Sequence, residues 1–467
     1  MTTQLRRALG FRDLVLFMIA TTFSLRWIAT AAAAGPSALV IWLIAAGGLF
    51  VPLAFTALEL STRYPDEGGI YVWSKRAFGP FAGFMTGWTY WAANLPYYPG
   101  LLYFAAGNLL FLGGDSWQAL ATNQWYFIAI SLAGLGVALA LNIVGLNVGK
   151  WLTNAGTIAL WVPLALLFAF GLTSWARTGA ATPITFASLR PDTALKDIIF
   201  WSTIAFAFGG LEGGLTMGEE IVDARRAVPR AILTAGVYIA FFYIAGTLCV
   251  LLALPKEQVS GLQGVMQAIQ TMSRQAGVPW LVPFLAALVT LNALGGLGGW
   301  FAATARLPFV AGLDRFLPPV FGQLHPRWGT PYVAMLVQGV IAAAFALLGQ
   351  AGTSVRGAYD VLVSMGVITY FIPYLFMFAA MIRLQREPAG PDVIRVPGGA
   401  PAARVLGALG FLVSAASIVL ACIPAPDEQH PTIAVVKVIG SSIALVLVGV
   451  AIYFAGRQTP ARELRPA

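Results

Sequence analysis

Charge is scarce in this sequence. Only 10% of its 467 residues are charged, whereas 58% are hydrophobic. A soluble protein of this length needs far more charge to cover its surface. No polar block is long enough for a separate soluble domain. No cleavable signal peptide is expected, because the first apolar run is too long and leads directly into further apolar runs. The scarcity of charge therefore predicts a polytopic membrane protein.

Cysteine and histidine are almost absent. Cys249 and Cys422 both lie within apolar runs, which indicates small core residues and not a disulfide framework. His325 and His430 are far apart and have no ligand-like neighbours. We therefore expect no metal site.

Motifs typical of enzymes are also missing. The sequence contains no HExxH and no GxSxG, so we predict no catalytic residues, no cofactor and no enzyme activity. It contains no GxxxxGK(S/T) phosphate-binding loop either. ATP-driven pumping is therefore not expected, and a solute or ion gradient should supply the energy.

Apolar runs of membrane-crossing length recur along the chain. A helix of about 20 apolar residues crosses the hydrocarbon core of a bilayer, and on this basis we predict twelve spans. Tilt would take up the excess length of the longer runs. The predicted spans are 11–33, 38–61, 80–112, 123–145, 148–173, 196–219, 229–254, 278–306, 331–349, 357–383, 403–422 and 432–456.

Basic residues are distributed unequally between the predicted loops. If both termini lie on one side, most of the 28 Lys and Arg residues fall on that side. Because basic loops stay in the cytoplasm, we predict a multi-pass protein of the cell membrane with both termini cytoplasmic. The basic residues are scattered in short loops, so the net charge of +9 does not indicate nucleic-acid binding. The expected partners are the lipid bilayer and a small solute.

The stretch FAFGGLEGGLTMGEE, which starts at Phe206, lies within the sixth predicted span. The spacing of Gly209 and Gly213, and of Gly210 and Gly214, is typical of close helix packing. We prefer packing for the similar GGLGG at 295–299, but packing does not explain Glu212. A charged side chain at bilayer depth costs about 2.5–3.5 kcal/mol, and such residues usually face a cavity. We therefore interpret the stretch as a broken helix that lines a binding site.

An inverted repeat would place a second broken helix in the first span. That span contains IATTFS from Ile19 to Ser24, whose Thr and Ser side chains can satisfy freed backbone groups. Arg26 follows in an apolar context. It could pair with Glu212, contact an anionic substrate or extend toward an interface. From the first span the candidate substrate-binding residues are Ile19, Ala20, Thr21, Thr22, Ser24 and Arg26.

Polar residues in other spans add further candidates. Asn94 and Tyr97 lie about ten residues into the third span, which places them near mid-depth. An interfacial aromatic belt is the alternative for Tyr97. The weaker candidates, each with a helix–helix hydrogen bond as the alternative role, are Asn292, Ser364 and Tyr370.

Three segments resemble the amino acid–polyamine–organocation (APC) superfamily of permeases, and the resemblance covers nearly the whole chain. They are ELSTRYPDEGGIYVWSKRAFGPFAGFMTGW (59–88), GEEIVDARRAVPRAI (218–232) and ARLPFVAGLDRFLPPVFGQLHPRWGTPYVA (305–334). The resemblance implies one all-α membrane domain over 1–467 that transports amino acids or related amines by alternating access. It implies a 5+5 inverted repeat (11–173 and 196–383) with broken helices one and six, and two additional helices (403–456).

The resemblance also implies how the site is built. Backbone groups of the two breaks would hold an amino acid by its carboxylate and amino groups, and an aromatic residue near the sixth-span break would help to close the site. Phe208 matches that place, and Phe206 is a second candidate. From the sixth span the implied substrate-binding residues are Phe206, Ala207, Phe208, Gly209, Gly210 and Glu212.

The sequence departs from the family pattern at two places. IATTFS contains no glycine where relatives carry a glycine-rich break, and TNAGTIALWVPL, from Thr153, lacks the lysine of some proton-coupled relatives. A lysine-dependent proton mechanism is thus disfavoured, while exchange, facilitated uptake and proton transfer through Glu212 stay open. A transport-derived sensor or a channel is the alternative to a carrier. A homodimer is left open.

Overall fold

The computed structural model describes residues 10–64, 68–191, 195–210, 212, 224–305, 316–391, 393–424, 428 and 430–456. All regular elements within these ranges are helical, and they contain no strand. The helices are α1 (Phe11–Thr22), α2 (Leu25–Ala34), α3 (Ser37–Ala45), a π-helix (Ala46–Phe50), α4 (Val51–Arg63), α5 (Ile70–Phe78), α6 (Pro80–Ala92), α7 (Asn94–Leu109), α8 (Gln124–Val144), α9 (Leu146–Thr178), α10 (Phe186–Leu189), α11 (Leu195–Phe206), α13 (Ala224–Ala253), α14 (Gly264–Gln275), α15 (Leu281–Thr304), α17 (Tyr332–Gln350), α18 (Val355–Leu384), α19 (Gly399–Ala421) and α20 (Pro431–Gly456). Short 3₁₀ helices occur at Leu110–Leu112, Gly114–Thr122, Lys256–Gln258 and Pro319–Gly322.

Nine continuous helical segments of the described chain are long and apolar enough to cross a membrane. They are Ser37–Arg63, Gln124–Val144, Trp151–Thr178, Arg226–Ala253, Leu281–Thr304, Tyr332–Gln350, Val355–Leu384, Gly399–Ala421 and Pro431–Gly456. Each overlaps one of the predicted spans. The multi-pass, all-helical class predicted from the apolar runs is therefore confirmed.

The remaining three predicted spans do not form single long helices in the described residues. The first, 11–33, consists of α1 and α2, and the third, 80–112, consists of α6, α7 and a 3₁₀ turn. In the sixth, 196–219, α11 ends at Phe206, and most of the rest lies outside the described residues. Apolar composition does not reveal where a helix stops within an apolar run, and these three spans stay predictions.

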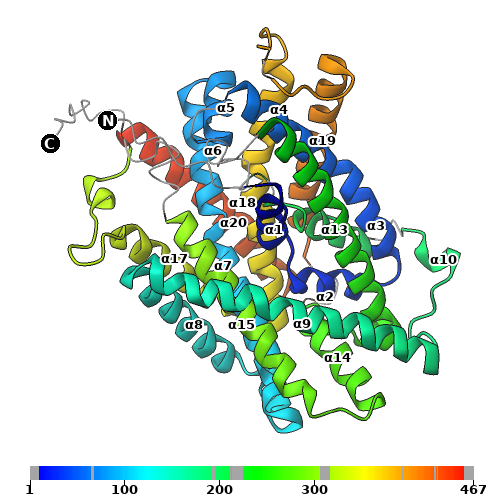
Figure 1. The fold of residues 1–467 in the computed structure, drawn as a ribbon. Coiled ribbons are helices and arrows are strands. Elements are labelled where there is room, and N and C mark those ends of the chain that lie inside the picture. The colour runs from blue at the N-terminus through cyan, green and yellow to red at the C-terminus, as the bar shows by residue number, and fades with distance from the viewer. Residues whose placement is uncertain are drawn as a thin grey trace.

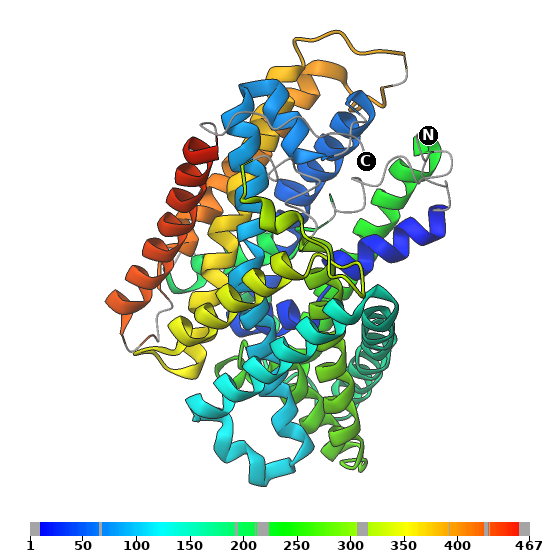
Figure 2. The ribbon, with the colours of Figure 1, turned by 90° about the vertical axis from the view of Figure 1, so that its left-hand side faces the viewer.

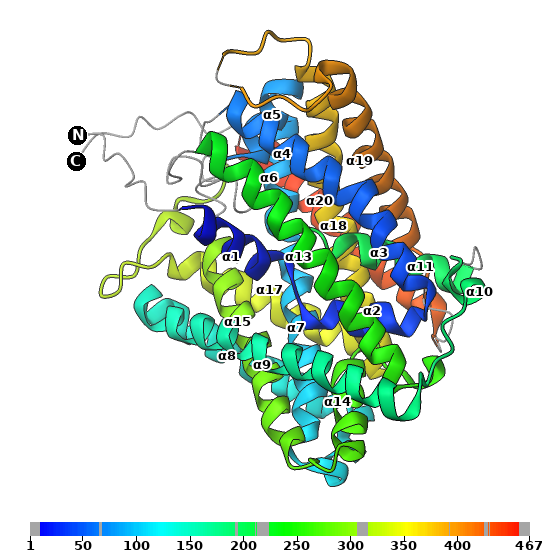
Figure 3. The same cartoon turned by 45° about the vertical axis from the view of Figure 1, so that its right-hand side comes forward.

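The helices enclose α18, which runs through the middle of the molecule (Figures 1 and 2). In the most apolar part of α18, 78% of the residues are buried, compared with 28% in α8, α19 and α20. The outward faces of the surrounding helices are apolar, as shown by Ile158, Val237 and Val340, which are 68–70% exposed. An apolar exterior around a packed interior suits lipid as the surrounding solvent. α2 is almost entirely buried among the other helices, and a short straight segment joins it to α1 (Figure 3).

The GGLGG stretch packs α15 against α9. A Cβ atom on Gly295 would lie 2.7 Å from the Cα atom of Gly156 and 2.7 Å from the carbonyl oxygen of Leu152. Asn292 donates a hydrogen bond to the carbonyl oxygen of Gly156 at 3.0 Å in the same crossing. The predicted packing role is therefore confirmed at Gly295, where the small size of glycine allows a backbone contact, whereas Gly296 lines the cavity described below.

Alanine at position 295 should destabilise this crossing. Because the obstructing atoms belong to the backbone, α9 and α15 must move apart, and we expect a loss of about 1–3 kcal/mol, typical of overpacking. Gly440→Ala in α20 is the matched control, since a Cβ atom there meets nothing within 4 Å. Thermal unfolding of the purified variants would measure the difference. Equal melting temperatures for the two variants would contradict the packing role.

Candidate functional site

The first predicted span is interrupted near its middle. α1 ends at Thr22 and α2 begins at Leu25. Between them, Phe23 (φ −82°, ψ 130°) and Ser24 (φ −143°, ψ 134°) are extended. Extended backbone is open to any residue, so IATTFS interrupts the helix without the glycine that relatives use. The predicted candidates Ile19 and Ala20 lie in the last turn of α1.

The end of α11 meets this interruption. After Phe206 the chain forms turns over residues 207–210. Gly210 has φ +109°, and a Cβ atom on it would lie 2.8 Å from the carbonyl oxygen of Thr21. Glycine is therefore required at position 210 by both its backbone conformation and its contact with α1. Gly213 and Gly214, the partners in the predicted packing pairs, lie outside the described residues.

One tyrosine hydroxyl joins the two interruptions. The Tyr243 hydroxyl of α13 donates toward the carbonyl oxygens of Thr22 (2.8 Å) and Ala207 (3.1 Å), which can share its proton. It accepts a hydrogen bond from the backbone N–H of Ser24 at 3.3 Å. The ring is fully buried and stacks on Trp42, with 4.3 Å between the ring centroids. Tyr243 therefore satisfies backbone groups that the interruptions set free.

A cavity of about 90 Å³ lies between the interrupted helices, α7 and α15. Trp27, Trp300 and the weaker candidates Asn292 and Tyr370 contribute to its wall. The predicted candidates that line it are Thr21, Thr22 and Ser24 of the first span, Asn94 and Tyr97 of the third, and Phe206, Gly209 and Gly210 of the sixth. Interrupted backbone thus occurs where it borders a cavity, as the low polarity of a bilayer demands.

The two aromatic candidates of the sixth span lie in different surroundings. The Phe206 ring packs edge-on against Trp27 at 5.4 Å and against Tyr370 at 5.2 Å, beside the cavity. Phe208 is fully buried against Trp42 and Phe50 and does not line the cavity. Ala207 is also buried, and its carbonyl oxygen faces Tyr243. Of the two, only Phe206 is placed to cover the cavity.

Glu212 is buried and lies among tyrosines. Its Oε1 accepts hydrogen bonds from the hydroxyls of Tyr370 (2.5 Å) and Tyr90 (3.0 Å). Its Oε2 accepts from the Tyr374 hydroxyl (2.7 Å) and from the backbone N–H of Gly210 (3.2 Å). Four donors satisfy both oxygens of this buried carboxyl group, which would be costly to leave unpaired. The cluster joins α6 and α18 to the end of the α11 segment.

Arg26 does not pair with Glu212. It is 1% exposed, and the ion pairs of the described chain do not include it. Its guanidinium carbon lies 3.9 Å from the ring centroid of Trp27 and 4.5 Å from that of Tyr97. Nε and Nη1 are buried and have no hydrogen-bond partner. Neither the ion pair nor the extension to an interface that the sequence left open is present.

Sequence reasoning missed several residues that shape the site. Trp27 and Trp300 line the cavity, while Tyr90, Tyr374 and Tyr243 hold the groups around it. All five are aromatic residues in apolar runs, a pattern too common in membrane helices to single any of them out. Only the fold shows which hydroxyl meets a freed backbone group or a carboxylate.

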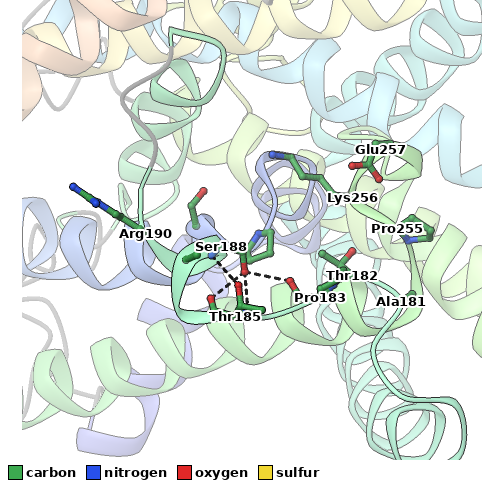
Figure 4. Close-up of a pocket in the computed structure, with 12 residues that line it drawn as sticks. Ala181, Thr182, Pro183, Thr185, Ser188, Arg190, Pro255, Lys256 and Glu257 are labelled. Carbon is green, nitrogen blue, oxygen red and sulfur yellow. Dashed lines mark hydrogen bonds between the residues drawn. The ribbon is translucent and has the colours of Figure 1, made fainter.

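A larger hollow of about 390 Å³ lies elsewhere, beside the loop that contains α10 (Figure 4). Its wall combines residues 181–190, Pro36, Ser37 and residues 255–257. Thr185 and Ser188 hydrogen-bond to each other, and Arg190 extends away from Lys256 (Figure 4). Because the hollow touches neither interruption, we assign the candidate site to the smaller cavity.

Nothing in the described residues resembles a metal site, because no three His, Cys, Asp or Glu side chains gather there. The cavity wall combines backbone groups, hydroxyls, amides and aromatic rings, and neither Glu212 nor Arg26 is among the described residues that line it. Such a set can bind a small polar solute by hydrogen bonds.

Comparison with known proteins finds relatives that are named as transporters. The chain is similar to an uncharacterized transporter of Legionella pneumophila, with 27% identity over 90% of each chain. It is similar to a probable agmatine/putrescine antiporter of Lactococcus lactis, with 25% identity over 93% of this chain and 92% of the relative. A glutamate/gamma-aminobutyrate antiporter of the same organism is 24% identical over 90% of this chain and 85% of the relative.

The family model described as amino acid permease matches residues 9–453. This range contains all three segments that carry the resemblance to the APC superfamily, although 65–67, 218–223 and 306–315 lie outside the described residues. The match covers both interruptions and the cavity between them. The chain therefore belongs to the amino acid permease family of the APC superfamily.

Proposed function

We propose that this permease carries amino acids or related amines across the cell membrane by alternating access, with the cavity between the two interruptions as its binding site. The observation that carries the proposal is the contact between Gly210 and Thr21, which brings the two interruptions together at the cavity. Two broken helices around a central site are the arrangement by which many secondary transporters hold a substrate. The names of the two antiporter relatives support the same substrate class.

The helix ends suit the two main-chain groups of an amino acid. Ser24 precedes α2 without capping it by a side-chain hydrogen bond, so the first N–H groups of α2 face the interruption without a cap. The positive end of the helix dipole favours a carboxylate at this place. Carbonyl groups at the end of α1 and in the turn 207–210 suit the ammonium group. Thr21, Thr22, Ser24, Phe206, Gly209 and Gly210 are the proposed contacts.

The larger architecture is part of the proposal. Twelve spans, an inverted repeat of 11–173 and 196–383, and two additional helices at 403–456 follow from the apolar runs and the family. Both termini would lie in the cytoplasm, because most Lys and Arg residues fall in the loops on their side. The family relationship favours a carrier over an enzyme, and an exchange mechanism needs no lysine in the fifth span.

Counterflow in proteoliposomes tests this function. Liposomes that contain the purified protein and an unlabelled amino acid should accumulate the same labelled amino acid, whereas protein-free liposomes should not. A panel of neutral, acidic and basic amino acids and of polyamines would define the class. No counterflow with any member would contradict the carrier. Substrate-induced currents far above carrier turnover would favour the channel alternative instead.

A further inference from the structure

The guanidinium of Arg26 is a buried cation whose hydrogen-bonding capacity is not used. Nε and Nη1 have no partner, and no carboxylate of the described residues pairs with the side chain. The two aromatic rings beside it offer cation–π attraction, but their faces do not replace the in-plane acceptors that a guanidinium seeks. A buried donor without an acceptor is costly, so this group indicates a ligand.

The cation lies directly behind the wall of the candidate site. Trp27 and Tyr97, the two rings that sandwich it, both line the cavity. A Cβ atom on Gly100 of α7 would lie 3.7 Å from Nη1, an ordinary van der Waals distance, so α7 packs closely beside the guanidinium. Arg26 is not among the described residues that line the cavity, so one of these rings must move before a solute can contact the guanidinium. Arg26 therefore lies one side chain away from the cavity.

Glu212, the acidic residue near the site, already uses its hydrogen-bonding capacity. Both oxygens of Glu212 are occupied by three tyrosine hydroxyls and the N–H of Gly210. The carboxylate thus has little capacity left for the ammonium group of a basic substrate. Among the described residues near the cavity, Arg26 therefore offers a cation with free donors, whereas Glu212 offers no free acceptor.

We propose that the transported solute is an amino acid with an acidic side chain, and that Arg26 binds its side-chain carboxylate. This inference rests on the proposed function, in which the first turn of α2 holds the main-chain carboxylate. The planar fork of Arg26 can bind a carboxylate through two parallel hydrogen bonds, which an amide side chain cannot match in charge. A free inorganic anion such as chloride is the alternative ligand for the same guanidinium.

Exchange by the reconstituted full-length protein separates acidic from other substrates. The probes are L-glutamate, L-aspartate, L-glutamine and agmatine. For the wild type we expect kcat/KM for L-glutamate to exceed that for L-glutamine by at least about 100-fold, because the amide leaves the guanidinium without its anion. Arg26→Gln should abolish this preference, so that kcat/KM for L-glutamate falls to within about threefold of that for L-glutamine in the same variant. Arg26→Lys should keep part of the preference, because it keeps the charge.

Thermal stabilisation of the purified protein provides a readout that does not require transport. L-Glutamate should raise the melting temperature of the wild type and not that of Arg26→Gln, whereas L-glutamine should have little effect on either. To test an inorganic anion as the ligand, the melting temperature in sodium chloride is compared with that in sodium gluconate. Stabilisation by chloride alone, lost in Arg26→Gln, would overturn the acidic-substrate assignment.

The two proposals fail in different ways. If no probe is exchanged, the carrier function fails, while stabilisation by L-glutamate that depends on Arg26 would still support an acidic ligand. If exchange occurs but the wild type prefers agmatine or L-glutamine, or if Arg26→Gln leaves the preference unchanged, the inference about Arg26 is wrong and the carrier stands. If Arg26→Gln does not yield folded protein, Arg26→Lys takes its place, and the ratio of L-glutamate to L-glutamine exchange is measured for that variant. A ratio near one for the wild-type protein overturns the assignment.

Discussion

Phenylalanine at position 243 is expected to reduce substrate exchange by at least about 100-fold, because each buried polar group left unpaired costs about 1–3 kcal/mol. The variant keeps the ring and its stacking on Trp42 but removes the hydroxyl. The carbonyl oxygens of Thr22 and Ala207 and the N–H of Ser24 then lose their common partner. The two interruptions are no longer held at a fixed separation, so the cavity loses its shape. Initial rates of counterflow per amount of reconstituted protein would measure the effect.

Tyr238→Phe is the matched control for this prediction. Tyr238 lies on the same helix, α13, and is 48% exposed on the outer face of the molecule. Its substitution should leave exchange within about threefold of the wild type, as expected for a surface change. If Tyr243→Phe exchanged substrate as fast as Tyr238→Phe, the hydroxyl would have no part in shaping the site.

Alanine at position 210 should abolish exchange. The backbone of Gly210 has φ +109°, and left-handed backbone costs an ordinary residue about 1–2 kcal/mol. The added methyl group would also lie 2.8 Å from the carbonyl oxygen of Thr21, a contact that only a backbone shift can relieve. Because the turn 207–210 and the end of α1 form the cavity wall, that shift removes the binding geometry. Counterflow should fall to the level of protein-free liposomes.

Gly136→Ala in α8 provides the comparison for position 210. Gly136 is exposed and a Cβ atom on it meets nothing within 4 Å, so helix propensity favours the alanine by about 1 kcal/mol. We expect normal exchange and an unchanged or slightly raised melting temperature. Retention of exchange by Gly210→Ala, with a melting temperature equal to that of the wild type, would show that the contact between the two interruptions is not required.

The sequence predicts most of the long apolar helices well, because a long apolar run in a bilayer can satisfy its backbone hydrogen bonds only as a helix. Nine of the runs are continuous helices in the described chain. The interruption in the first span was predicted near Ile19–Ser24 from its hydroxyl residues and from the family, and it occurs at Phe23 and Ser24. The interruption forms without glycine, because Phe23 and Ser24 both have extended backbone. A glycine pattern signals one way to open a helix but not the only one.

The site itself was less predictable, because side-chain partners depend on which helices become neighbours. Arg26 and Glu212 looked like a natural pair by charge, yet one lies between aromatic rings and the other among tyrosines. Nothing in the spacing of Tyr243 marks it as the residue that joins the interruptions. Charge and polarity identify candidate groups, whereas their partners emerge only from the tertiary arrangement.

The hydrogen bonds around Glu212 have a consequence for the transport cycle. The tyrosines belong to α6 and α18, whereas the carboxylate belongs to the segment after α11, so these parts cannot separate without stripping the carboxylate of its donors. A bare anion is not tolerated in hydrocarbon, so water or a proton must arrive as the tyrosines leave. Separation of these helices is therefore coupled to the arrival of a group that replaces the lost hydrogen bonds.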